Sequence, residues 1–248
     1  MRKSKVRESL LALLAAACVV LVSAAISFFT NVSSYYIASA LVLPIILLLR
    51  READAFLMIL FTALLAIGMH EVIYFTPILL SLIMLLTPIC VDMRTGATLA
   101  ETLSKLGFKG GIVRAFLFAV VSMLPALVLV FLLSQVAYYL GFDDAHKVDQ
   151  KITALPPYIL LYAVTVGPLA EEVFFRSFLT RYVGPIPANI IFAFAHLSYG
   201  SVYEIVGAFG LGIFLYLLFK ISGDLKSPIF AHMMINAGSL YMIKYMQF

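Results

Sequence analysis

Three short polar clusters lie inside otherwise apolar stretches in the last third of the sequence. They read Glu-Glu-x-x-x-Arg at residues 171–176, Phe-x-x-x-His at 192–196 and His-x-x-x-Asn at 232–236. An ionisable side chain at the centre of a membrane helix costs roughly 2.5–3.5 kcal/mol on insertion scales. A chain this apolar has little reason to keep such groups unless they meet, so we expect them to form one functional site.

Helical spacing assigns different directions to the charged side chains of the first cluster. Glu172 and Arg176 lie four residues apart on one helix face, where they can form an ion pair. Glu171 is turned by about 100° from Glu172 and is free to point elsewhere. One turn earlier, Gly167 and Pro168 are expected to loosen or kink the helix and to free backbone groups near the carboxylates.

The two later clusters each place two side chains one helical turn apart. Phe192 precedes His196 by one turn, and His232 precedes Asn236 by the same spacing. A carboxylate beside an imidazole can hold and deprotonate a water molecule. A second imidazole and a carboxamide can donate hydrogen bonds to the oxyanion that forms when this water attacks an amide carbonyl. The residue types therefore indicate peptide hydrolysis by an activated water, with no need for a serine or cysteine nucleophile.

The elements that must position these clusters are membrane helices. The chain is 63% hydrophobic and 12% charged, with a mean hydropathy of +1.06, whereas soluble domains carry about 25% charged residues. Apolar runs of about 20 residues, the length that crosses a bilayer, recur along the whole sequence. We therefore expect an all-α fold, a polytopic transmembrane helix bundle whose catalytic cavity lies among the C-terminal helices.

We predict eight or nine spans in this bundle, with ends uncertain by about 2–4 residues. The candidate helices cover residues 9–30, 35–49, 53–69, 72–91, 112–140, 155–180, 186–200, 203–221 and 228–246. Residues 92–111 predict a surface-lying amphipathic helix, and residues 141–153 a mixed-charge loop. We assign residues 1–95 to N-terminal transmembrane helices of unknown role and residues 96–248 to the protease-like core.

The positive charges predict the orientation of the helices. With the N-terminus in the cytoplasm, most lysines and arginines fall in cytoplasmic loops, as the positive-inside rule requires. The polar clusters then lie about six to ten residues from the cytoplasmic helix ends, up to about 15 Å deep, and can face one cavity that opens to the cytoplasm. A cleaved signal peptide at the first helix is an alternative that leaves the other spans oriented as before. The net charge of +4 is a topology signal, and no basic stripe indicates nucleic acid.

The three motifs, in this order on late helices, resemble those of the CPBP family, the CAAX-protease and bacteriocin-processing proteins that include the Rce1-like prenyl-protein endopeptidases. The flanking residues 105–108, 167–170 and 224–231 agree with that family, and the resemblance covers about residues 100–245. It implies an intramembrane glutamate-type endopeptidase of the CAAX prenyl protease 2 kind, in the lipid bilayer and without a cofactor. The implied partner is a peptide or protein substrate, prenylated in one branch of the family.

The resemblance also implies roles for individual residues, carried over by position. Glu171 and His196 would activate the water as a general-base pair. His232 and Asn236 would donate hydrogen bonds to the oxyanion. The supporting residues would be Glu172, Arg176 and Phe192.

Other interpretations of these residues stay open. Zinc held by Glu171, His196 and His232 is a chemical rival, although the sequence lacks His-Glu-x-x-His and has Asn236 where a second ligand would be expected. The Glu-Arg pair alone would also suit a structural role. A non-catalytic immunity or scaffold protein of the same fold, or a proton-coupled transporter with buried carboxylates, are the alternatives of a different class.

Overall fold

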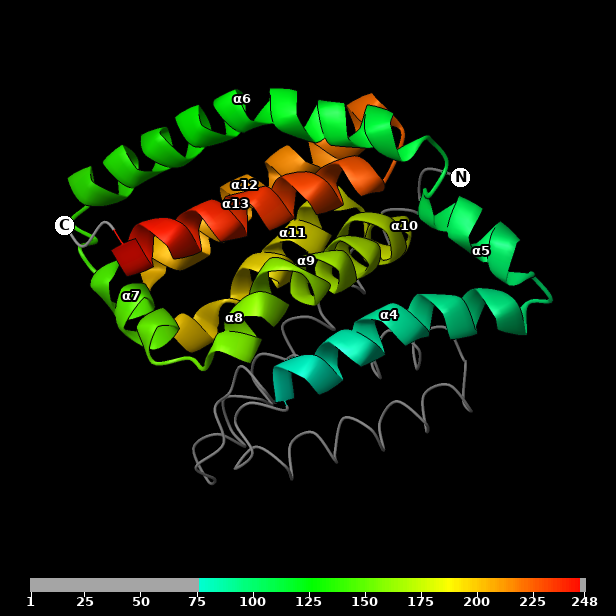
Figure 1. Cartoon of the computed structure of the whole chain (residues 1–248), viewed down its shortest axis with the longest axis horizontal. Coiled ribbons are helices and arrows are strands. Elements are labelled where there is room, and N and C mark those ends of the chain that lie inside the picture. Colours follow the sequence, from blue (N-terminus) through cyan, green and yellow to red (C-terminus); the bar gives the residue numbers. More distant parts are fainter. Residues whose placement is uncertain (1–75, 246–248) are drawn as a thin grey trace, which may run out of the picture.

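The computed structural model describes residues 76–245, in which every regular element is a helix (Figure 1). The α-helices are α4 (Thr76–Arg94), α5 (Leu99–Leu106), α6 (Ile112–Tyr139), α7 (His146–Thr153), α8 (Pro157–Val164), α9 (Val166–Glu171), α10 (Thr180–Val183), α11 (Pro185–Phe194), α12 (Val202–Ser222) and α13 (Lys226–Tyr245). A π-helix, η1 (Glu172–Leu179), and a 3₁₀-helix, η2 (Leu197–Tyr199), complete the set. The spans predicted at 9–30, 35–49 and 53–69 and the signal-peptide alternative lie outside the described residues.

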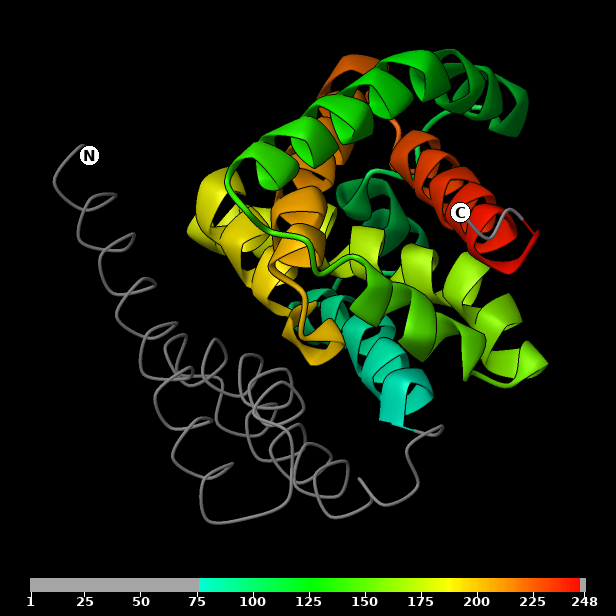
Figure 2. The same cartoon turned by 90° about the vertical axis from the view of Figure 1, so that its left-hand side faces the viewer.

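The segment from α8 to α10 runs between two groups of helices. α4 packs against α9 and η1, and on other faces of the segment α13 contacts α8 and α9 while α11 contacts η1. α12 packs along α11 and α13, and the long helix α6 lies across both α12 and α13 (Figures 1 and 2). The residues that carry the first polar cluster are therefore surrounded by helices that are distant in sequence.

Helix α6 has one face of small residues and one of large apolar residues. Ala115, Ala119 and Ala126 are almost fully buried, which lets α12 and α13 approach closely. Val121 and Leu124 are 75% and 72% exposed on the other face. Water would make such a face unfavourable, whereas the acyl chains of a bilayer solvate it.

Three helical segments in the described part of the chain are long and apolar enough to cross a membrane: 112–139, 157–183 and 202–222. They correspond to the spans predicted at 112–140, 155–180 and 203–221. The helices α4 and α13 overlap the spans predicted at 72–91 and 228–246 but are not among these three. The all-helical fold is confirmed over residues 76–245, and the count of eight or nine spans is not.

Two predicted elements differ from the observed ones. The helix predicted at 186–200 is wrong in its second half, because α11 ends at Phe194 and the chain turns through η2 to Gly200, which has a φ of +68°. The loop predicted at 141–153 is also wrong, because α7 forms within it. Its one buried apolar residue, Val148, is 8% exposed and anchors a helix whose other residues are mostly polar.

The predicted loosening of the central helix near Gly167 and Pro168 is confirmed. α8 ends at Val164, and Thr165, with φ −125° and ψ −79°, separates it from α9. Proline has no N–H, so Pro168 cannot bond to the carbonyl of Val164 four residues earlier, and a regular helix is interrupted there. The chain then continues as α9 and passes into the π-helix η1 at Glu172.

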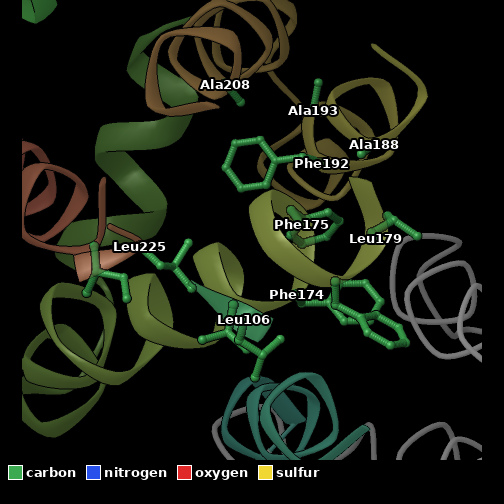
Figure 3. Packing of buried hydrophobic residues seen from close by; sticks show 12 residues of the cluster. Leu106, Phe174, Phe175, Leu179, Ala188, Phe192, Ala193, Ala208 and Leu225 are labelled. Atoms are coloured by element: carbon green, nitrogen blue, oxygen red, sulfur yellow. The ribbon is translucent and has the colours of Figure 1, made fainter. Parts of the chain in front are cut away.

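An aromatic core surrounds the π-helix. Phe174, Phe175 and Phe178 are each at most 3% exposed, and Phe175 packs edge-to-face on Phe192 of α11 with ring centroids 5.2 Å apart. Leu106, at the end of α5, reaches this same cluster (Figure 3). The amphipathic segment predicted at 92–111 thus forms only one short helix, and its apolar residue Leu106 packs into the protein core.

Candidate active site

Glu172, Arg176 and His232 form a polar cluster that is sealed from solvent, with 0%, 1% and 3% of their surfaces exposed. Glu172 Oε2 lies 3.2 Å from Arg176 Nε, and Glu172 Oε1 lies 2.9 Å from His232 Nδ1. One carboxylate therefore joins the first and third sequence motifs. Since a carboxylate accepts hydrogen bonds, Nδ1 of His232 carries a proton in this contact.

Glu171 stands at the open edge of this cluster. Its side chain is 29% exposed, and its Oε2 lies 3.7 Å from His232 Nε2. His232 is thus placed between two carboxylates, with Glu172 at one ring nitrogen and Glu171 at the other. The adjacent glutamates occupy different environments, one sealed and charge-paired, the other accessible.

His196 is half-buried, and one of its ring nitrogens is occupied. Its Nδ1 lies 2.9 Å from the carbonyl oxygen of Phe192. A carbonyl only accepts hydrogen bonds, so Nδ1 carries the proton, and in the neutral ring Nε2 is left as a basic lone pair. The imidazole packs on Phe192 with centroids 4.8 Å apart and stacks on Tyr199.

Phe192 connects the three motifs through its ring. Arg176 places its guanidinium carbon 4.1 Å from the ring centroid, close enough for a cation–π contact. The same ring lies 4.8 Å from that of His196 and 6.2 Å from that of His232. The aromatic side chain expected to pack on His196 also contacts residues of the other two motifs.

The side chain of Asn236, on α13, forms a hydrogen bond with the end of α8. Its Nδ2 donates a 2.9 Å hydrogen bond to the carbonyl oxygen of Ala163, in the last turn before the break at Thr165. Carbonyls at a helix end lack intrahelical partners, so this bond satisfies one of them. The second N–H of the carboxamide is left for another acceptor.

The predicted site residues are therefore brought together from four elements, with two qualifications. Glu171 is paired with His232 rather than with His196, since within residues 76–245 no ion pair joins Glu171 to His196. The carboxamide of Asn236 is engaged by Ala163. The general-base pair and the oxyanion donors remain predictions, because both require a bound water or substrate.

Sequence reasoning missed two polar residues beside the site, Tyr162 and Asn189. Tyr162 of α8 donates a 2.8 Å hydrogen bond to the carbonyl oxygen of Pro77 and also contacts the hydroxyl of Ser81, which fixes α4 against the segment that carries the glutamates. Asn189 of α11 is 2% exposed, inside the protein. A polar residue within an apolar helix, like those of the three motifs, is the signal that could have singled out Asn189.

A metal site is the alternative chemistry for these residues. In the part of the chain that the structure describes, no group of three or more His, Cys, Asp or Glu side chains is arranged to hold a metal ion. Of the three ligands of the zinc hypothesis, Glu171 and His232 lie near each other, and His196, whose Nδ1 faces a backbone carbonyl, has Nε2 left as its free ring nitrogen.

Comparison with known proteins places this region in a family. Residues 153–238 match the family model described as type II CAAX prenyl endopeptidase Rce1-like, and this stretch contains all three polar motifs. It is an Rce1-like domain, and the CPBP/Rce1-like assignment made from the motifs is confirmed. The family implies a protease, and the three apolar helices with it point to a membrane protein. No curated protein and no solved structure is significantly similar to the chain.

Proposed function

We propose that this protein is an intramembrane endopeptidase of the glutamate type, which hydrolyses a peptide bond with a water activated by Glu171 and His196. The observation that carries the proposal is the contrast between the two adjacent glutamates. Glu172 is sealed and neutralised by Arg176 and His232, whereas Glu171 is accessible beside the same imidazole. A sealed carboxylate can orient its neighbours, and an accessible one can take a proton from water.

The proposed reaction uses Glu171 and His196 as the base. A water between them loses a proton to the Glu171 carboxylate, or to the free Nε2 of His196, as its oxygen attacks the substrate carbonyl carbon. The C–N bond then breaks, and the proton passes to the leaving amine. The products are a carboxylic acid and an amine, which ionise to a carboxylate and an ammonium group, so atoms and charge balance without a covalent intermediate.

His232 and Asn236 are proposed to stabilise the oxyanion of this reaction. His232 would donate through Nε2 as an imidazolium, since its Nδ1 already faces Glu172 and its Nε2 lies beside Glu171 at the open edge of the cluster. Asn236 would use the N–H of its carboxamide that does not bond to Ala163. Removing a single oxyanion donor lowers kcat by about 10²–10³ in well-studied hydrolases.

The substrate is proposed to be a peptide or protein with a prenylated C-terminal tail, which reaches the site from the cytoplasmic side or laterally from lipid. This proposal rests on the description of the matched family. An apolar chain attached to the substrate would be solvated by the same lipid that contacts the exposed face of α6.

The test is cleavage of a farnesylated CAAX-type peptide by the purified full-length protein in detergent, with the cut site read by mass spectrometry. Wild type is compared with Glu171→Gln, His196→Gln and the matched control Glu204→Gln, whose half-buried carboxylate lies in the first turn of α12. We expect the first two variants to lose at least about 10²-fold in kcat and the control to keep it.

Each arm of this test separates one alternative. Activity that survives in both site variants would refute the glutamate mechanism. Loss of wild-type activity on adding a zinc chelator, with recovery on adding zinc, would establish the zinc-dependent alternative. A folded wild type that cuts neither this peptide nor an unprenylated peptide library would favour the non-catalytic scaffold or immunity function.

A further inference from the structure

Asn189 is a buried polar residue that belongs to none of the three motifs. It lies on α11 and is 2% exposed, and its side-chain oxygen Oδ1 has no hydrogen-bond partner among the described residues. Burying a carboxamide oxygen without a donor is unfavourable. An unsatisfied acceptor next to a proposed active site therefore needs an explanation.

Arg176 has the opposite deficiency. Its Nε, Nη1 and Nη2 atoms are buried and have no hydrogen-bond acceptor in the described part of the protein. Arg176 Nε lies 3.2 Å from Glu172 Oε2, which makes an ion pair, but its N–H does not point at that oxygen as a hydrogen bond requires. The ring of Phe192 offers only a cation–π contact. A guanidinium offers five N–H donors, so this side chain is rich in donors that lack an acceptor.

The unsatisfied acceptor and the unsatisfied donors meet at Gly212 of α12. A Cβ atom built on Gly212 would lie 2.3 Å from Asn189 Oδ1 and 3.2 Å from Arg176 Nη2. These two atoms therefore cannot be farther apart than the sum of those distances. The same Cβ would lie 3.1 Å from Phe192 Cδ1, so a glycine is what leaves room for all three side chains.

We propose that Asn189 is a positioning residue for the active site, whose Oδ1 accepts a hydrogen bond from Arg176 Nη2 in the space that Gly212 leaves. In this proposal, rotation of either side chain brings the two atoms within hydrogen-bonding distance. Arg176 fixes Glu172, which in turn holds Nδ1 of His232. Asn189 thus acts on the proposed oxyanion donor through two intermediaries. The activity part of this proposal rests on the proposed function.

The first test is kinetic and uses variants that differ in their ability to accept the bond. Asn189→Leu keeps the approximate size of the side chain but removes the acceptor, and Asn189→Asp keeps it. We expect Asn189→Leu to lower kcat at least tenfold with KM changed less than twofold, because no substrate contact is removed. Asn189→Asp should recover most of the lost kcat. Equal activity of Asn189→Leu and wild type, or equal loss in both variants, would overturn the proposal.

The glycine provides a second variant with a matched control on the same helix. Gly212→Ala should displace Asn189 Oδ1 and Arg176 Nη2 and lower kcat to a similar extent as Asn189→Leu. At Gly207 a Cβ would meet nothing within 4 Å, so Gly207→Ala should keep wild-type activity. Full activity of Gly212→Ala would contradict the proposed packing.

The contact itself is tested without any activity, by thermal unfolding of the full-length protein in detergent. We expect Asn189→Leu to lower Tm in the wild-type background and to leave it unchanged in Arg176→Met, where no donor remains. Additive shifts would overturn the contact. If the shifts are non-additive and wild type cleaves no peptide, the proposed function fails while the Asn189–Arg176 contact stands. If wild type cleaves and the shifts are additive, only this inference fails.

Discussion

Two carboxylates in this protein are each paired with a cation about one helical turn away, but in opposite surroundings. Glu172 is fully buried and lies 3.2 Å from the buried Arg176, whereas Asp144 lies 3.8 Å from Lys147, which is 48% exposed. The first pair stands among the polar motifs of the Rce1-like domain. The second lies in the segment after the C-terminal end of α6, next to the start of α12.

The two pairs differ most in how well their hydrogen-bonding groups are satisfied. Asp144 accepts from the hydroxyl of Ser201 at 2.9 Å and from the backbone N–H groups of Val202 and Tyr203 at 2.8 and 3.1 Å. It thereby satisfies donors at the N-terminus of α12, where a negative charge is also favourable. Glu172 Oε2 and the nitrogens of Arg176 have no hydrogen-bond partner among the described residues.

This difference indicates what each pair contributes. A buried ion pair recovers little of the cost of desolvating two charges, so stability alone is a weak reason to keep one. The pair does fix the carboxylate that holds His232, which is a reason connected with the site. The Asp144 contacts satisfy a helix end and hold the segment after His196, so their contribution is to the fold.

The largest effect is expected when the buried pair is broken on one side. Glu172→Gln removes the counter-ion of Arg176 and leaves an uncompensated charge in a site without solvent. One-sided removal of a buried pair costs about 3–5 kcal/mol. Thermal unfolding in detergent, monitored by circular dichroism, should show this loss. The loss should be partly reversed in the double variant Glu172→Gln with Arg176→Met.

Glu204→Gln serves as the control for this experiment, because it makes the same chemical change at a half-buried position in the first turn of α12. If Glu172→Gln destabilises the protein no more than Glu204→Gln does, Glu172 is not the counter-ion that the buried Arg176 requires.

A smaller effect is expected at the exposed pair. Asp144→Ala removes three accepted hydrogen bonds at the start of α12, and loss of such capping interactions costs about 1–2 kcal/mol. Unfolding in detergent measures this loss, and Asp143→Ala, at the exposed neighbouring carboxylate, should have little effect. None of the residues that Asp144 contacts belongs to the three motifs, so the variant should keep kcat. A large fall in kcat would show that the Asp144 contacts also support the site.

The contribution of Asp144 should also depend on pH. Burial by itself raises the pKa of its carboxyl, but the accepted hydrogen bonds and the charge of Lys147 outweigh burial, so the pKa lies below its ordinary value of 3.8. A lowered pKa in the folded state stabilises the protein above the ordinary value and loses this effect as pH falls through the folded-state pKa. The Tm difference between wild type and Asp144→Asn should therefore be constant above about pH 5 and should shrink below pH 3.8. A difference that grows on acidification would contradict this assignment.

How far the sequence could predict these regions depends on how local each contact is. The Glu172–Arg176 pair and the Phe192–His196 contact follow from a spacing of four residues, and the break before α9 follows from Pro168. These features need only the geometry of a helix. The family was recognisable for the same reason, since its motifs are short and local.

Contacts between distant segments could not be derived in this way. His232 lies 60 residues from the Glu172 that it contacts, and only the packing of α13 against α8 and α9 places it between the two glutamates. The proximity of Asn189 and Arg176 at Gly212 likewise depends on how α12 packs against α11 and η1. The π-helix was missed because it is only eight residues long, too short for its altered period to be recognised in the hydrophobic pattern.

The smallest effect is expected at Lys147, the exposed partner of Asp144. Its Nζ lies 3.8 Å from the carboxylate and donates a 3.2 Å hydrogen bond to the carbonyl oxygen of Gly200. Exposed pairs of this kind contribute about 0–1 kcal/mol, because solvent screens the charges and ordering a long side chain costs entropy. Lys147→Met should therefore change the unfolding temperature no more than Lys109→Met does, at an exposed lysine just before the N-terminus of α6. A loss as large as that of Asp144→Ala would mean that the cation contributes as much to stability as the hydrogen bonds of the carboxylate, and would contradict this prediction.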